Sequence, residues 1–267
     1  MCKTIKKYNL SKASTRKLYG YISNTFFFAR KKEFIVKNPA EFFKAKDFYH
    51  YCQEHYKPAD GRLVQKDDMK KLQLQFKKDR EKKPNYIPTY AVEFACLTGM
   101  RVGEIAALRW DHIETNRIVI EYSEKYNADR TKYWIDRPKN GKIRFFPMTD
   151  QLRLFLNNLK MVEQKYGYFC EWVFANENGR LHAPLISSCS KTKCRQAKVN
   201  LNGEKGIRIF RRTLNSNLRS RGVSAASAAE MLGHSVQVNE QYYTFDMMNG
   251  QDKVRILSDI NKSVQAV

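Results

Sequence analysis

The sequence predicts a mainly α-helical protein with one small antiparallel β-sheet, which is an α+β fold. Along most of the chain, apolar residues recur with a period of about 3.6, between residues that commonly begin or end helices. The exception is residues 117–147, where β-branched and aromatic residues gather in short runs separated by turn residues. The length of 267 residues suits one large or two modest domains with a buried core.

The first 57 residues are expected to form a small helical domain. Ser11 is placed to cap a helix over residues 11–30. One face of this helix would be apolar, with Leu18, Tyr21, Ile22, Phe26 and Phe27, and another would be basic, with Lys12, Arg16, Lys17, Arg30, Lys31 and Lys32. Residues 38–41 read Asn-Pro-Ala-Glu, which is typical of a second helix start, because Asn can cap and Pro suits the first position.

Residues 66–267 are expected to form the larger domain, with a linker over residues 58–65 before it. Its helices would cover residues 66–83, 89–100, a stretch capped by Thr149, 184–199, 211–221, 224–232 and 237–246, with a last amphipathic segment over 250–267. Three strands, over residues 117–123, 131–136 and 143–147, would form the antiparallel sheet, and 172–174 a short buried strand. Asn140-Gly141 is a hairpin turn signal.

The charge balance indicates a polyanionic partner. The chain has 49 Lys and Arg against 27 Asp and Glu, a net charge of +22 and a pI near 9.7. A membrane surface is the rival partner, but the sequence has neither a long apolar run nor a signal peptide pattern. The basic residues occur in both expected domains, so both are expected to contact the polyanion.

The composition gives no sign of a cofactor. The six cysteines form no Cys-x-x-Cys motif, and the nearest pair, Cys189 and Cys194, has no histidine nearby at ligand spacing. We therefore expect reduced thiols, no metal site and a cytoplasmic location. There is no Gly-rich phosphate loop, so no nucleotide cofactor is expected either.

Residues 208–243 carry the strongest chemical signal. Arg208 and Arg211 are one helical turn apart, a Leu232-Gly233-His234 corner follows, and Tyr243 lies nine residues after the histidine. Cations that neutralise a phosphodiester, together with a phenolic oxygen that attacks it, form a set suited to phosphoryl transfer.

This stretch resembles the C-terminal signature of the tyrosine recombinase (phage integrase) family, which has the form H-x-x-R, then L-G-H, then Tyr. Residues 98–105, Thr-Gly-Met-Arg-Val-Gly-Glu-Ile, resemble the T-G-x-R-x-x-E box of the same family. Residues 139–147, Lys-Asn-Gly-Lys-Ile-Arg-Phe-Phe-Pro, resemble its K-x-x-K-x-R-x-x-P hairpin. The resemblance implies a helical catalytic domain preceded by a core-binding domain. Relatives usually have four or five helices in that domain, so here it is either a short natural form or lacks its N-terminal helices. Residues 123–130 make the hairpin longer than the minimal form of many relatives, which implies a small insertion that contacts DNA or a partner subunit.

The resemblance assigns roles to single residues. Arg101 and Arg211 would bind the non-bridging phosphate oxygens, and His234 would donate a further hydrogen bond. Tyr243 would be the nucleophile, leaving a 3′-phosphotyrosine and a free 5′-hydroxyl. Lys139 would protonate the departing 5′ oxygen, with Lys142 as the competing choice. We expect Glu104 to pair with Arg101 and hold its guanidinium for the phosphate.

The sequence departs from the family pattern at Arg208, which stands where the usual motif has histidine. An arginine keeps its charge and is a poor proton acceptor, although it can still stabilise the phosphate. Its position one turn before Arg211 favours a second phosphate clamp.

The partners implied by the resemblance are double-stranded DNA and further copies of the chain, as a dimer to a tetramer on DNA, with an accessory DNA-bending protein as another candidate. Residues expected to contact DNA are Lys12, Arg16, Lys17, Lys31, Lys142, Arg144 and Arg212. Residues 250–267 are expected either to contact the neighbouring protomer or to pack on their own domain. The rival functions are a DNA-binding protein of the same fold with impaired catalysis and a structural interaction protein, and relaxation of supercoiled DNA is a candidate side activity.

Overall fold

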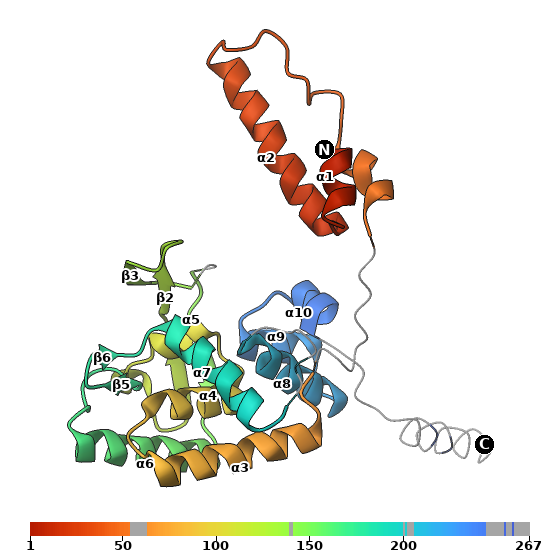
Figure 1. Ribbon diagram of the computed structural model, residues 1–267. Coiled ribbons are helices and arrows are strands. Elements are labelled where there is room, and N and C mark those ends of the chain that lie inside the picture. Colours follow the sequence, from red (N-terminus) through yellow and green to blue (C-terminus); the bar gives the residue numbers. More distant parts are fainter. Residues whose placement is uncertain are drawn as a thin grey trace. The chain divides into compact units, whose positions relative to one another are not determined.

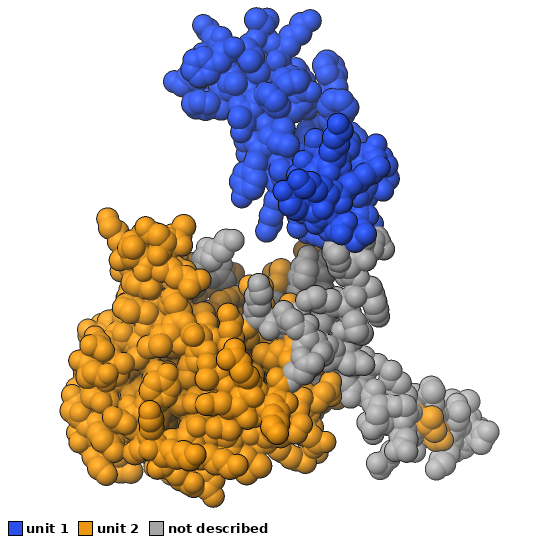
Figure 2. All heavy atoms as spheres, viewed as in Figure 1, with its two compact units in different colours: residues 1–57 blue, residues 58–267 orange. Residues whose placement is uncertain are grey.

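The computed structural model describes residues 1–53, 63–138, 141–199, 201 and 206–243, together with Val254 and Ser258. For residues 241–243 it describes the backbone alone. The chain divides into two compact units, residues 1–57 and 58–267, which are coloured separately in Figure 2. The expected fold class is confirmed, since the described elements are mostly helices with small antiparallel sheets (Figure 1). No helix in these described ranges is long and apolar enough to cross a membrane.

The first unit is built around one long helix. It contains α1 (Cys2–Lys7), α2 (Lys12–Lys31) and the 3-10 helix η1 (Ala45–Tyr51). The cap expected at Ser11 is present, because its side chain accepts a hydrogen bond from the Ser14 amide at 3.3 Å. The apolar face of α2 is only partly covered, since Tyr21 and Phe27 are 72% and 64% exposed.

The prediction of a second helix that starts at Asn38 is wrong. The Asn38 side chain instead accepts from the Ala40 amide at 2.9 Å, a local turn that competes with helix formation. The Glu41 carboxylate pairs with Arg30 of α2 and does not cap its own backbone. The next helical element begins at Ala45, where the Asp47 side chain accepts from the Lys44 amide at 2.7 Å.

The second unit is a helical domain with α4 at its centre. Its helices are α3 (Lys66–Lys82), α4 (Ile87–Thr98), α5 (Val102–Ala106), η3 (Trp110–His112), α6 (Asp150–Tyr166), α7 (Ala183–Gln196), α8 (Arg208–Ser220), α9 (Ala225–Leu232) and α10 (Val236–Tyr243). Helix α4 packs against α3, α7 and α8 and is nearly all buried. Phe94 of α4 meets Phe174 edge to face, with ring centroids 5.2 Å apart. The expected cap at Thr149 is present, and Ser224 caps α9 in the same way.

The strands of the second unit pair differently from the expectation. Strand β1 (Arg117–Ile120) pairs with β4 (Arg144–Pro147), and β2 (Ser123–Tyr126) pairs with β3 (Tyr133–Asp136), so two two-stranded sheets replace the expected single three-stranded sheet. A third pair joins β5 (Ala175–Asn176) to β6 (Gly179–Arg180), and the expected strand at 172–174 contributes only a bridge from Trp172 to Arg109.

Glu124 gives the physical reason for this separation. Its buried carboxylate accepts from the Ala183 amide at 2.9 Å, contacts His182 Nδ1 at 2.8 Å, and pairs with Arg180. These bonds tie β2 to the start of α7, away from β1. Residues 123–126, expected to begin an insertion, therefore form one strand of a hairpin that projects from the helical body (Figure 1).

Two glycines end helices where chain segments approach closely. Gly99 ends α4 with φ of 60°, and a Cβ there would lie 3.2 Å from the Arg211 Cα. Gly233 ends α9 with φ of 68°, and a Cβ there would lie 2.9 Å from the Arg144 Cδ. Both positions need glycine for the left-handed conformation and for space. They bring α4, α8, α9 and β4 together at one place.

Candidate active site

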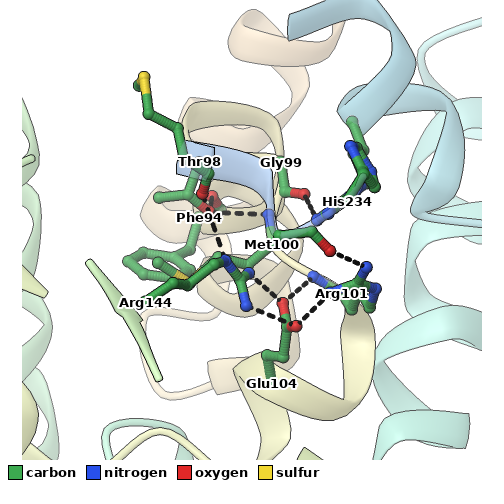
Figure 3. A network of polar contacts seen from close by, with 11 residues as sticks. Phe94, Thr98, Gly99, Met100, Arg101, Glu104, Arg144 and His234 are labelled. Carbon is green, nitrogen blue, oxygen red and sulfur yellow. Dashed lines mark hydrogen bonds and ion pairs between the residues drawn. The ribbon is translucent and has the colours of Figure 1, made fainter. Parts of the chain in front are cut away.

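The site lies where these elements meet, and it gathers three arginines, a glutamate and a histidine. Figure 3 labels Arg101, Arg144, Glu104 and His234 of this set. Arg101 is the residue before α5, and Glu104 lies inside α5. Arg144 begins β4, Arg211 lies in the first turns of α8, and His234 follows the Gly233 corner. The structure therefore brings Arg101, Arg211 and His234 together.

Glu104 is the centre of the polar network. It is 2% exposed, and its two oxygens accept from the Arg144 guanidinium at 2.8 and 2.6 Å. It also accepts from the Arg101 side chain and the Arg101 amide, both at 2.8 Å. Burial raises the pKa of this carboxyl, but the attraction of Arg144, Arg101 and Arg211 outweighs burial and lowers the pKa to about 2. Glu104 is therefore ionised at any physiological pH.

Arg101 is held firmly and remains accessible. One terminal nitrogen binds Glu104, which confirms the expected pair, and the other donates to the Gly233 carbonyl at 2.6 Å. The side chain is nevertheless 43% exposed. A guanidinium that is held through both terminal nitrogens and still partly exposed is suited to binding an oxyanion without further ordering.

Arg211 and His234 form a second linked pair. Arg211 is 2% exposed, donates from one terminal nitrogen to the Gly99 carbonyl at 2.9 Å, and donates from Nε to His234 Nε2 at 2.8 Å. Burial lowers the pKa of His234 to about 3, and the charges of Arg211 and Arg101 act in the same direction. The imidazole is therefore neutral. Because Nε2 accepts a hydrogen bond, we assign the ring proton to Nδ1.

Arg208 stands apart from this network. It is the first residue of α8 and is exposed, whereas Arg211 one turn later is buried. Within the ranges described above, the Arg208 side chain makes no hydrogen bond or ion pair. Its guanidinium is therefore exposed to solvent and is not held by the polar network of the site.

Two expected catalytic residues lie partly or wholly outside the described structure. Lys139 is outside the described residues. Tyr243 is the last residue of α10, a helix that packs against α8 and α9, and its side chain is not described. Lys142, the rival of Lys139, is exposed and lines a groove of about 430 Å³ together with His234.

The residues expected to contact DNA divide into three groups. Four lie exposed along α2 of the first unit: Lys12, Arg16, Lys17 and Lys31. Lys142 is exposed in the second unit, and Arg212 is half-buried in α8. Arg144 corrects the expectation, because it is 7% exposed and its donors bind Glu104 and the Met231 carbonyl. Arg144 therefore supports the site from the protein interior and is not a surface residue available to contact DNA.

The role of Arg144 was missed although the sequence carries a signal for it. In β4 the burial alternates, with Arg144 and Phe146 inward and Phe145 outward. A strand places alternate residues on one face, so the apolar Phe146 indicates that Arg144 faces the interior as well.

Among the described residues, no group of His, Cys, Asp and Glu is arranged to hold a metal ion.

Comparison with known proteins agrees with this geometry. The model of the phage integrase family matches residues 62–249. The fold is similar to Tn1549 transposon integrase in complex with a circular intermediate DNA, with a TM-score of 0.71 and 15% identity over 97% of this chain and 82% of that chain. A search of curated proteins by sequence found no match.

Two further solved structures are similar. A lambda integrase dimer bound to a COC′ core site has a TM-score of 0.57 and 16% identity, over 90% of this chain and 63% of that chain. XerH site-specific recombinase bound to its difH substrate has a TM-score of 0.53 and 16% identity, over 73% and 54% of the two chains. The catalytic fold is thus that of the tyrosine recombinases. The chain belongs to the phage integrase family and is a tyrosine-type DNA recombinase.

Proposed function

We propose that the protein is the integrase or transposase of a mobile element, and that it cuts and rejoins DNA through a 3′-phosphotyrosine at Tyr243. The observation that carries this proposal is the network of Arg101, Glu104, Arg211 and His234. It presents fixed cations and a neutral imidazole beside α10, the helix on which Tyr243 lies. The similar Tn1549 and lambda integrase structures hold DNA, which supports double-stranded DNA as the substrate.

The proposed reaction exchanges one phosphodiester for another. The Tyr243 oxygen attacks phosphorus, its proton passes to water, DNA or His234, and the bond to the 5′ oxygen breaks. Arg101 and Arg211 stabilise the charge that gathers on the non-bridging oxygens, and His234 donates a hydrogen bond from Nδ1. Lys139 gives its proton to the departing 5′ oxygen. The bond energy is retained in the phosphotyrosine, so ligation by a partner 5′-hydroxyl needs no nucleotide.

The domain assignment is part of this proposal. Residues 1–57 act as a short core-binding domain, 58–65 as a linker, and 66–267 as the catalytic domain. The exposed basic residues of α2 support DNA contact by the first unit, and the net charge of +22 supports contact by both units. Assembly into a dimer or tetramer on DNA, residence in the cytoplasm or nucleoid, and partner contacts by residues 250–267 are proposed with it. That segment lies outside the described residues except Val254 and Ser258.

The test is covalent trapping on nicked DNA. The protein is mixed with a pool of nicked duplexes of randomised sequence, in which the cut fragment diffuses away and prevents ligation. Protein-linked DNA that survives detergent is isolated and sequenced, and the linked peptide is mapped by mass spectrometry. We expect an adduct at Tyr243.

Two variants distinguish the proposal from its rival. Tyr243→Phe should still bind the selected duplex and form no adduct, because only the attacking oxygen is removed. Tyr242→Phe is the matched control and should trap as the unmodified protein does. Binding without any adduct from the unmodified protein would favour the DNA-binding protein with impaired catalysis.

A further inference from the structure

Arg144 reaches three parts of the active site from β4. Its terminal nitrogens bind both Glu104 oxygens at 2.8 and 2.6 Å, and its Nε donates to the Met231 carbonyl at 3.2 Å. Its side chain also packs on Gly233, where an added Cβ would meet the guanidinium at 3.0 to 3.2 Å. Arg144 therefore touches the segment that follows Arg101 and the corner that precedes His234.

The hydrogen bonds of Glu104 are divided unequally between two arginines. Arg144 binds it through both terminal nitrogens, whereas the Arg101 side chain uses only one nitrogen and gives the other to the Gly233 carbonyl. A carboxylate prefers a two-pronged contact with a guanidinium. Without Arg144, Glu104 would be a buried anion with Arg101 as its nearest cation.

The charges of these residues also indicate that Glu104 depends on Arg144. Glu104 and Arg144 are 2% and 7% exposed, so together they form a buried pair of zero net charge. With Glu104 balanced in this way, the three arginines and one carboxylate of the network together keep two net positive charges at the site. A buried carboxylate that lost its partner would cancel one of them.

We propose that Arg144 is a positioning residue that occupies and neutralises Glu104, so that Arg101 stays directed toward the scissile phosphate. Arg144 does not touch the phosphate itself. This inference rests on the proposed function, because it assigns Arg144 a part in the same strand cleavage. It predicts a defect in the chemical step and not in DNA binding.

The experiment is single-turnover trapping on a nicked duplex selected as above. Arg144→Met should slow adduct formation by roughly 100-fold, as for a displaced catalytic group, while DNA affinity stays within about twofold of the unmodified protein. Arg144→Lys keeps the charge but loses the two-pronged contact, and its rate of adduct formation should lie between those of Arg144→Met and the unmodified protein. Arg117→Met is the matched control, because Arg117 is on the adjacent strand β1, pairs with Glu114 outside the site, and should trap at the unmodified rate.

Two readouts separate this role from general support of the fold. The double variant Glu104→Gln, Arg144→Met should trap at least about fivefold faster than Arg144→Met, since a neutral amide needs no counter-charge. On a duplex with a neutral methylphosphonate at the cleaved position, the Arg144→Met defect should shrink, because less charge must be stabilised. A double variant as slow as Arg144→Met, or an equal defect on both duplexes, would overturn the inference.

The same experiment keeps the two proposals apart. If the unmodified protein forms no adduct, the proposed function fails. If it forms one and Arg144→Met forms it equally fast, only the role of Arg144 fails. Thermal unfolding of each variant is measured alongside, so that loss of the folded protein is not counted as slow cleavage.

Discussion

Glu163 is a buried carboxyl group outside the catalytic network, and it should make the stability of the second unit depend on pH. It lies in the last turn of α6 and is 0% exposed. Its Oε1 accepts a hydrogen bond from the Ala175 amide at 3.1 Å. Burial raises its pKa from 4.5 to about 8, and the Ala175 amide and Trp110 oppose this only in part.

The sign of the effect follows from proton counting. Between pH 4.5 and about 8 the folded protein keeps a proton on Glu163 that the unfolded chain has lost. The free energy of unfolding should therefore fall as pH rises through this window, by about 1.4 kcal/mol per pH unit from this group. Between pH 5 and pH 7 the loss is about 3 kcal/mol.

Glu163→Gln tests this, because glutamine is isosteric and cannot ionise. Urea unfolding is followed by tryptophan fluorescence, which reports on the second unit since all three tryptophans, Trp110, Trp134 and Trp172, lie there. The variant should gain stability over the unmodified protein steadily from pH 5 to pH 7.5. Glu81→Gln, on the exposed side of α3, is the matched control and should show no such trend. A stability difference for Glu163→Gln that stays constant with pH would refute the reasoning.

Three other predictions concern the active site. Arg208→Ala should slow single-turnover cleavage roughly 10- to 1000-fold, while Arg208→His is tolerated better, and cleavage at the unmodified rate would place residue 208 outside the site. In thermal unfolding, Gly99→Ala should destabilise the protein by about 1–3 kcal/mol more than Gly167→Ala does. Both glycines have positive φ, but only a Cβ at Gly99 would press on the Arg211 backbone, at 3.2 Å. In NMR titration of the free protein, His234 should stay neutral down to about pH 4, whereas titration near 6.5 would contradict its burial beside Arg211.

The sequence predicted the helix ends well, because their causes are local. Gly99, Gly233 and the cap residues Ser11 and Thr149 act within one turn of their own helix. The prediction failed at Asn38 for a reason that is also local, since the same side chain can serve a helix cap or a tight turn. Spacing alone does not choose between the two.

The strand pairing could not be predicted because its cause is distant. Glu124 is drawn away from β1 by Arg180 and His182, which are 56 and 58 residues further along the chain. Similarly, the sequence alone indicates that Arg144 is an exposed basic residue on a hairpin. Its burial became evident only from its contact with Glu104, 40 residues earlier in the chain. Motif spacing identified the residues that converge, but not the buried partner that holds them.

The protonation states limit which groups can accept the tyrosine proton. An arginine such as Arg208 is a poor proton acceptor, and Glu104 is a weak base because the neighbouring arginines lower its pKa to about 2. Among the described residues of the network, this leaves the neutral His234, whose pKa is held near 3 largely by burial and by Arg211. A bound phosphodiester would offset those positive charges and raise the pKa of His234. It would also draw Arg211 toward its oxygens and away from Nε2, so that DNA binding itself would make the histidine a better base at the moment of cleavage.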